Sequence, residues 1–338
     1  MKNYIENTLK FILFLALGCF VLWLALKDQD LEMLGNRIKG ANFYWAGLSM
    51  LIGFSAHVLR AFRWNMLIEP LGYKAHIKNT TISVFIGYLA NFAIPRLGEV
   101  TRCAVLSKNE TIPFNKLVGS VFVERVIDLI TLLLVIVFTL LIQFDLLKDF
   151  FMKFFNEKVE GKLNSVYFLL IVAAISFVLI VIILYTLREK LMEHHLAIKI
   201  KTFIIGLLEG MKSIRSLKNI PLFLLYTFLI WILYWGMTYV CFFSIAGTSH
   251  LSVAAGFAVF VAGALGMTAP VQGGIGTFHA LTMQLLLLYG VSETDGLAYA
   301  FVTHGAQSVM VVIVGFVSIL LIPIFQNKKI KNDTTGTN

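Results

Sequence analysis

The sequence is poor in charged residues. Asp, Glu, Lys and Arg make up only 14% of its 338 residues, whereas a soluble domain carries roughly 25%. Apolar residues account for 58%, and the mean hydropathy is +0.83. Because so few polar side chains cannot cover a water-facing surface, the composition excludes a soluble globular protein and predicts that a membrane is the solvent.

Cysteine and catalytic motifs are also scarce. Cys19, Cys103 and Cys241 are odd in number and far apart, which excludes a disulfide framework and a cysteine metal site. The chain has no Walker loop, dinucleotide fingerprint, metal-spaced His/Glu set or nucleophile elbow. We therefore expect no metal and no cofactor, and any transport would be passive or driven by a gradient. The net charge of +9 does not indicate nucleic-acid binding, since no soluble basic domain is present.

Long apolar stretches predict an all-α polytopic fold. About 20 apolar residues cross the roughly 30 Å of hydrocarbon in a bilayer. Six stretches meet this length, the first being an uncleaved N-terminal span: Leu9–Leu26, Ala41–Leu67, Leu117–Phe144, Ser165–Leu187, Ile220–Gly247 and Leu297–Phe325. We interpret residues 1–338 as a single membrane domain.

Loop charges predict the orientation of these spans. Residues 188–218 hold seven Lys and Arg against three Glu and read as a cytoplasmic amphipathic connector, because basic loops stay on the cytoplasmic side. Residues 60–78 and the C-terminal tail are basic too, whereas 289–296 are acidic. The pattern favours a cytoplasmic-type membrane with both termini in the cytoplasm.

Two further apolar stretches run into Pro/Gly breaks and are expected to form re-entrant helical hairpins, one from each face. The first hairpin covers about residues 80–116 and the second about 251–290. Val84-Phe85 before Pro95 matches Val259-Phe260 before Pro270 at an offset of 175. The first repeat, 41–144, would then recur inverted as the second repeat, 220–325, which is a frequent transporter design.

Charged residues near the first break are the main candidates for a site. Arg96, Glu99 and Arg102 follow the break, and Glu124, Arg125 and Asp128 lie inside the next predicted span. Arginine suits phosphate because its planar fork donates paired hydrogen bonds, and charges inside a span default to a functional role. The alternative is a locked internal network that pairs Arg125 with Asp128 and Glu124 with Arg102 or Arg96. Arg60 and Arg63 end a span, so we expect them to snorkel beside an interfacial Trp64.

At the second break, backbone N–H groups rather than charged side chains are the candidates for binding an anion. Gly273-Gly274-x-Gly276 opens the next helix toward His279, and bare peptide groups at a helix N-terminus attract anions. Close helix packing by glycine is the alternative. His304 and Gln307 take the places of Arg125 and Asp128 in the second repeat, and we expect His304 to be a hydrogen-bonded buried histidine.

Several motifs carry a family resemblance over about residues 8–325. They are Arg63-Trp64 with Gly72, Asn91-x-x-x-Pro95-Arg96-x-Gly98-Glu99-x-x-Arg102, Val123-Glu124-Arg125-x-x-Asp128, and Pro270-x-x-Gly273-Gly274-Ile275-Gly276. The chain resembles the flippase-like membrane family that includes the transmembrane region of lysylphosphatidylglycerol synthases. Gln272 departs from the proline or small residue common there, and Thr277-Phe278-His279 departs from a common acidic residue, which weakens a proton-linked role.

The resemblance implies movement of a phospholipid or lipid-linked headgroup between leaflets. It also implies that the aminoacyl-transferase domain of fused relatives is absent, so that no aminoacylated lipid is made. Membrane lipids are expected as environment and substrate. The residues of the break motifs and His279 would contact the headgroup, and the polar residues inside the spans, with His304 and Gln307, would form the gate. Two alternatives stay open: a membrane-embedded transferase or accessory factor that uses a polyprenyl-phosphate or lipid-linked donor, and a scaffold. A homo-oligomer or an envelope-assembly partner is compatible with each.

Overall fold

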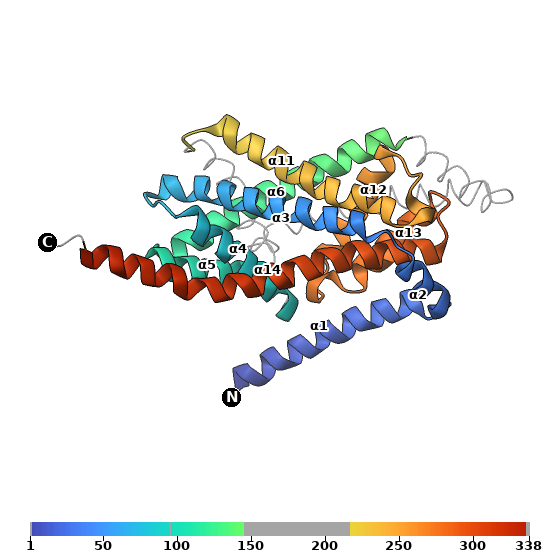
Figure 1. The fold of residues 1–338 in the computed structure, drawn as a ribbon, viewed down its shortest axis with the longest axis horizontal. Coiled ribbons are helices and arrows are strands. Elements are labelled where there is room, and N and C mark those ends of the chain that lie inside the picture. Colours follow the sequence, from blue (N-terminus) through green and yellow to red (C-terminus); the bar gives the residue numbers. More distant parts are fainter. Residues whose placement is uncertain (1, 95, 145–216, 336–338) are drawn as a thin grey trace, which may run out of the picture.

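The computed structural model describes residues 2–94, 96–144 and 217–335, and every regular element in these ranges is a helix (Figure 1). The predicted span Ser165–Leu187 and residues 188–216 of the predicted connector lie outside the described residues, as does Pro95. The all-α prediction is therefore confirmed for the described part of the chain.

Four described helices are long and apolar enough to cross a membrane. They are α3 (Phe43–Ile68), α6 (Phe114–Ile142), α11 (Ile220–Val240) and α14 (Glu293–Thr335), and they coincide with four of the six predicted spans. Their outer faces carry exposed apolar side chains such as Leu134, Phe228 and Leu320, which are 61–73% exposed. Since water would oppose that exposure, lipid is the solvent of these faces.

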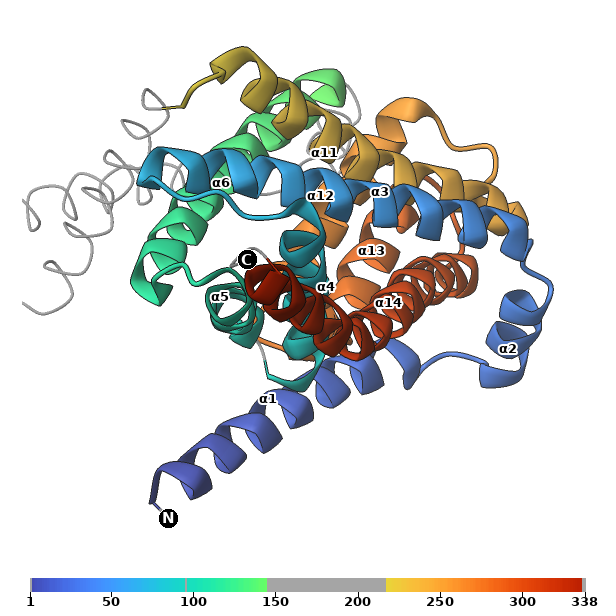
Figure 2. The ribbon, with the colours of Figure 1, turned by 60° about the vertical axis from the view of Figure 1, so that its left-hand side comes forward.

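The N-terminal helices lie at the edge of the bundle. Helix α1 (Lys2–Leu26) matches the predicted first span and packs against the second half of the chain, whereas α2 (Leu31–Lys39) caps the start of α14 (Figure 2). Gln29 binds Glu293 at 2.5 Å, and Arg37 pairs with Asp295 at 3.3 Å.

Each predicted hairpin region forms two short helices around a break. The first pair is α4 (Ile77–Ala93) and α5 (Leu97–Glu110), and the second is α12 (Val253–Thr268) and α13 (Thr277–Leu287). With 11–17 residues and a rise of 1.5 Å, each helix is about 17–26 Å long, too short to cross about 30 Å of hydrocarbon alone.

Proline chemistry explains both breaks. A proline disfavours the helical conformation of the residue before it. Ile94, before Pro95, is extended with φ −139° and ψ 126°, and Ala269, before Pro270, has φ −59° and ψ 147°. Glycines then allow tight packing. Gly98 faces the Gly87 carbonyl, and Gly266 faces the Phe278 backbone so closely that a Cβ added to Gly266 would be 2.7 Å from Phe278 Cα.

The two breaks lie against each other. The second contains η5 (Gln272–Gly274), which contacts α4. Phe92, near the end of α4, covers Gly273 so closely that an added Cβ would sit 2.9 Å from its Cε1. Helix α1 packs on the same region, with Gly18 beside Gly276.

Helix α3 joins the two halves of the core. Its N-terminal half, with Ala46, packs in a cluster formed with α1, α2 and α12–α14. Its C-terminal half, with Ala61 and Trp64, packs in a cluster formed with α4–α6. Helix α11 runs alongside α3, and α14 lies against α4 and α13 (Figure 2). The remaining short elements are η1 (Glu69–Leu71), η3 (Cys241–Ser244) and η4 (Ala246–Thr248).

Candidate functional site

Seven charged side chains from three helices form one network. Helix α3 contributes two arginines, α5 a glutamate and an arginine, and α6 the remaining three, as follows: Arg60, Arg63, Glu99, Arg102, Glu124, Arg125 and Asp128. Glu124 and Asp128 are ten and fourteen residues into the 29-residue α6, about 15 and 21 Å along its axis. The network therefore lies near the middle of a membrane-length helix.

Glu124 is its centre. The residue is fully buried, and its carboxylate lies 2.7 Å from Arg60 Nε, 3.6 Å from Arg63 Nη2 and 3.2 Å from Arg102 Nη1. Asp128 accepts from Arg63 Nη2 at 2.6 Å and also binds Arg60. The two acids of α6, one helical turn apart, thus hold both arginines of α3 against them.

A second, more exposed pair bridges α5 and α6. Arg125 Nη2 lies 3.1 Å from Glu99 Oε1, with the two side chains 40% and 29% exposed, and Arg125 Nη1 is 3.6 Å from Asp128 Oδ2. Glu99 lies three residues before Arg102 on α5, a spacing that permits an ion pair. The structure instead joins Arg102 to Glu124, as the locked-network alternative proposed.

Positive charge exceeds negative charge in the network. Four arginines face three carboxylates, so the formal net charge is +1. Arg102 is 3% exposed, yet its Nε and Nη2 have no hydrogen-bond partner, and neither has Arg63 Nε. A buried donor without a partner is costly, and these N–H groups keep a hydrogen-bonding capacity that no described residue uses.

One aromatic residue, Trp64, holds Arg102 in place. Its guanidinium lies 4.7 Å from the ring centroid of Trp64, a cation–π distance. The Trp64 indole is itself fixed, because it is fully buried and donates to Ser120 Oγ at 2.9 Å. Arg102 is therefore oriented by two helices other than its own.

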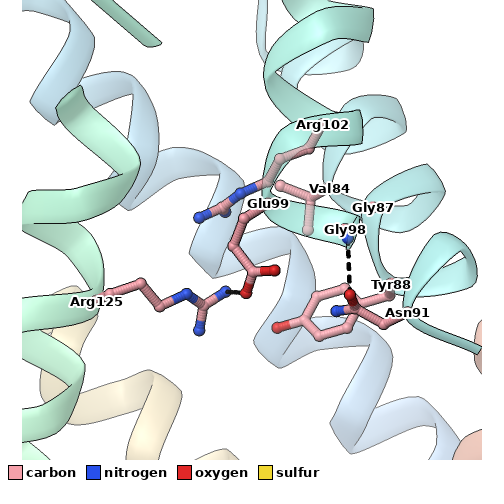
Figure 3. A pocket seen from close by; sticks show the side chains of 8 residues that line it. All are labelled: Val84, Gly87, Tyr88, Asn91, Gly98, Glu99, Arg102 and Arg125. Atoms are coloured by element: carbon pink, nitrogen blue, oxygen red, sulfur yellow. Dashed lines mark hydrogen bonds and ion pairs between the residues drawn. The ribbon is translucent and has the colours of Figure 1, made fainter. Parts of the chain in front are cut away.

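A small pocket opens beside Arg102, between the first hairpin and α6 (Figure 3). It leaves about 10 Å³ for the centre of a water-sized sphere and is lined by Val84, Gly87, Tyr88, Asn91, Gly98, Glu99, Arg102 and Arg125. Glu99 and Arg102 extend from α5 toward α6, and Arg125 extends in the opposite direction. The Asn91 side chain accepts from the Gly98 N–H at 2.7 Å, which ties the two helices of the hairpin together at the pocket.

Arg96 stands apart from this network. It is exposed, directly follows the break and has φ 65°, a left-handed conformation uncommon outside glycine. No ion pair of Arg96 occurs among the described residues. Such strained positions concentrate at functional sites, so Arg96 remains a candidate site residue outside the network.

The predicted residues of the second half form a separate polar region. His304 Nε2 lies 2.7 Å from the Gly273 carbonyl, and His279 Nδ1 accepts from the Gly276 N–H at 3.4 Å. The two imidazole rings are 4.9 Å apart. Gln272 and Gly274 are buried, whereas Pro270 is exposed. The prediction that His304 is a buried, hydrogen-bonded histidine is confirmed.

The structure corrects the prediction for Arg60 and Arg63. They do not snorkel to an interface: they are 5% and 0% exposed, and Trp64 is fully buried. The reason is electrostatic, since Glu124 and Asp128 lie inside the bundle and require cationic partners there. The signal in the sequence was helical spacing, because His57, Arg60 and Trp64 recur every three or four residues and so share one face.

Comparison with known proteins identifies the family. Residues 11–315 match the family described as the lysylphosphatidylglycerol synthase TM region. The chain belongs to this family. The match confirms the resemblance carried by the break and span motifs, and it makes the protein an integral membrane protein.

Curated relatives are more distant. A UPF0104 membrane protein of Methanocaldococcus jannaschii is 28% identical over 130 residues, which are 38% of this chain and 36% of that protein. A protein named glycosyltransferase AglD, of Haloferax volcanii, is 33% identical over 75 residues, 22% of this chain and 12% of its own length. The aligned part therefore spans well under half of either relative. No solved structure matches the chain.

Proposed function

We propose that this protein is a lipid carrier that moves an anionic phospholipid, or a lipid-linked phosphate headgroup, between the leaflets of a bacterial inner membrane. The observation that carries the proposal is the buried network with a net positive charge and two unpartnered Arg102 donors beside a pocket. A phosphate would complete those donors and neutralise the network.

Energetics favour a functional origin for the network. A charged side chain near the centre of a membrane helix costs about 2.5–3.5 kcal/mol on insertion scales. Glu124, Asp128 and the arginines of α3 repeat that cost several times, although an apolar core of similar volume would avoid it. A buried network with spare donors is consistent with a ligand that brings the missing charge.

The hairpins supply the expected carrier architecture. In transporters built from inverted repeats, broken helices meet near the midplane, where the substrate binds. The proposal takes both hairpins as re-entrant, both termini as cytoplasmic, and residues 41–144 and 220–325 as inverted copies. The contact between Phe92 and Gly273, which brings the two breaks together, supports this arrangement.

The small pocket corresponds to a closed state of the proposed carrier. Only about 10 Å³ of it is open to the centre of a water-sized sphere, which is about the room that one water molecule needs. Headgroup entry therefore requires α5 and α6 to part, and the exposed Glu99–Arg125 pair is the contact that must break first. An incoming phosphate would replace the Glu99 carboxylate at Arg125.

A membrane-embedded transferase is the second candidate. The match to a protein named glycosyltransferase favours it, with a lipid-linked donor held by the same arginines. The two functions differ in outcome, since a transferase changes the headgroup covalently and a carrier does not.

Translocation in proteoliposomes tests the proposal. The full chain is reconstituted with phosphatidylglycerol bearing a fluorescent acyl chain, and dithionite reports how much reaches the outer leaflet. We expect wild-type protein to accelerate the exchange and mass spectrometry to find the lipid unchanged. A chemically altered headgroup would instead support the transferase, and exchange at the rate of empty vesicles would end the carrier proposal.

A matched pair of variants tests the site. Arg102→Met and Lys108→Met each remove one positive charge from α5, but only Arg102 is buried beside the pocket. A hydrogen bond to a charged group contributes about 1.5–3 kcal/mol, so we expect Arg102→Met to slow translocation about tenfold or more. If folded Arg102→Met protein keeps the rate of Lys108→Met, Arg102 is not a headgroup contact.

A further inference from the structure

Helix α3 carries a row of polar residues on one buried face, interrupted by Gly53. Ser49, Gly53, His57, Arg60 and Arg63 follow one another at intervals of three or four residues, the spacing of one helix face. Their four side chains are 0–6% exposed. Fourteen residues at 1.5 Å give the row a length of about 21 Å, which is most of the roughly 30 Å hydrocarbon core.

One end of the row lies in the charged network, and two tyrosines continue the polar surface from there. Arg60 donates to the hydroxyls of Tyr88 and, at 3.1 Å, Tyr234. The two hydroxyls are 3.3 Å apart, and that of Tyr234 lies 3.5 Å from His57 Nδ1. Hydrogen-bonding groups from α4 and α11 thus extend the polar surface one helical turn beyond the arginines.

The far end of the row belongs to the second half of the chain. Gln307, on α14, donates from Nε2 to Ser49 Oγ at 2.7 Å and to Ser49 O at 3.1 Å. Its Oε1 occupies the space left by the missing side chain of Gly53, and this oxygen is buried without a hydrogen-bond partner. Both ends of the row therefore hold a buried polar atom without a hydrogen-bond partner: Gln307 Oε1 at this end and Arg102 Nε and Nη2 in the arginine network.

Helix cohesion alone does not account for these features. Polar residues that hold membrane helices together do so by pairing with each other, and an unpartnered polar group in hydrocarbon costs several kcal/mol. The outer face of α3 shows the ordinary alternative, because Leu51 there is 65% exposed. Polar groups that lack hydrogen-bond partners in the closed state and face the row are suited to bind a polar molecule that passes along it.

We propose that the polar row of α3 is the path by which the headgroup crosses the bilayer, with Gln307 as a second contact at the end away from the arginines. This inference rests on the proposed carrier function. The chemistry of the row suits a phosphate headgroup with hydroxyl groups, such as glycerol. The arginines take the phosphate, whereas the hydroxyls of Tyr88 and Tyr234, the His57 ring and the Gln307 amide exchange hydrogen bonds with the hydroxyl groups.

Two serines on α3 provide the test. Ser49 lies in the row, and Ser55 is exposed on another face, with its hydroxyl bonded back to Leu51 O. Ser49→Cys and Ser55→Cys are compared in full-length protein whose native cysteines are replaced by serine. A small charged methanethiosulfonate reagent is applied to proteoliposomes, and translocation of fluorescent phosphatidylglycerol is measured before and after.

We expect Cys at position 49 to react at least about tenfold faster than Cys at position 55, because opening the path admits water to Ser49. We also expect modification at position 49 to stop translocation, since the adduct fills the row. Equal reactivity of the two, or an unchanged rate after modification at position 49, overturns the path. If wild-type protein moves no lipid, the carrier function itself fails, so the two failures are distinct.

A second pair needs no cysteine and covers the case in which Ser49→Cys does not fold. Gln307→Leu removes the amide from the row, and Gln284→Leu makes the same change at an exposed position on α13. We expect translocation to fall about tenfold, equivalent to ~1.4 kcal/mol, in Gln307→Leu alone. Equal rates in the two variants overturn the role of Gln307 and with it the path.

Discussion

Replacement of Glu124 by Gln is the most direct test of the network. The side chain keeps its size but loses the negative charge that three arginines share at 2.7–3.6 Å. The formal charge of the network then rises from +1 to +2 in a site where Glu124 is 0% exposed. Breaking a buried ion pair by removing one partner costs about 3–5 kcal/mol, and we expect a loss of that size in the free energy of unfolding.

The matched control is Glu99→Gln. Glu99 has one partner, Arg125, at 3.1 Å, and the two side chains are 29% and 40% exposed. Exposed pairs contribute about 0–1 kcal/mol, so the same chemical change should cost far less. Unfolding is followed by circular dichroism as SDS is titrated into protein in mild detergent micelles. Comparing the two variants cancels any general effect of a Glu-to-Gln change.

A double variant separates charge from packing. Arg102→Met in the Glu124→Gln background removes the cation that the first change leaves unpaired. We expect the combined loss of stability to be smaller than the sum of the single losses by about 0.5–3 kcal/mol, the usual coupling of contacting residues. Equal losses in Glu124→Gln and Glu99→Gln, or strict additivity in the double variant, would refute the shared buried network.

The remaining predictions concern the hairpin and the topology. Gly98→Ala places a Cβ against the Gly87 carbonyl and the Asn91 side chain, and should lower the unfolding free energy by about 1–3 kcal/mol. Gly119→Ala meets open space and should leave stability unchanged or raised by up to about 1 kcal/mol, as SDS titration checks. Cysteines at Thr111 and Ser292 should react with impermeant reagents from opposite sides of the membrane, and labelling from the same side contradicts the inverted hairpins.

Much of the fold was predictable because membrane spans have a strong sequence signal. Twenty apolar residues in a row leave few alternatives to a helix, and four predicted spans match α3, α6, α11 and α14. The ends were less predictable: α1 begins at Lys2 rather than Leu9, and α14 continues to Thr335 past Phe325. Hydropathy locates the apolar part of a helix, whereas the polar ends continue for as long as backbone hydrogen bonds allow.

The site was predictable in composition but not in partners. Charges inside a span identified Glu124, Arg125 and Asp128, and the proline break identified the hairpin that carries Arg102. Arg60 was missed because its partners are 64 and 68 residues away, and no local pattern specifies which helix faces α6. Ser49 and Tyr234 gave no signal either. Burying a single hydroxyl costs little free energy when it is hydrogen-bonded, so only its position beside the polar residues of α3 indicates a role.

Coupling between the two halves follows from the contact of the breaks. Phe92 is one residue from Asn91, which binds the Gly98 N–H at the pocket, and it fills the space beside Gly273, whose carbonyl faces His304. Because packed interiors have little free volume, the end of α4 cannot move together with α5 without displacing the turn that contains Gly273. In the proposed carrier, a headgroup that parts the first hairpin from α6 therefore acts on the second hairpin through direct contact. The α3 row, bounded by Arg63 at one end and by Gln307 of α14 at the other, lies between the parts that would move.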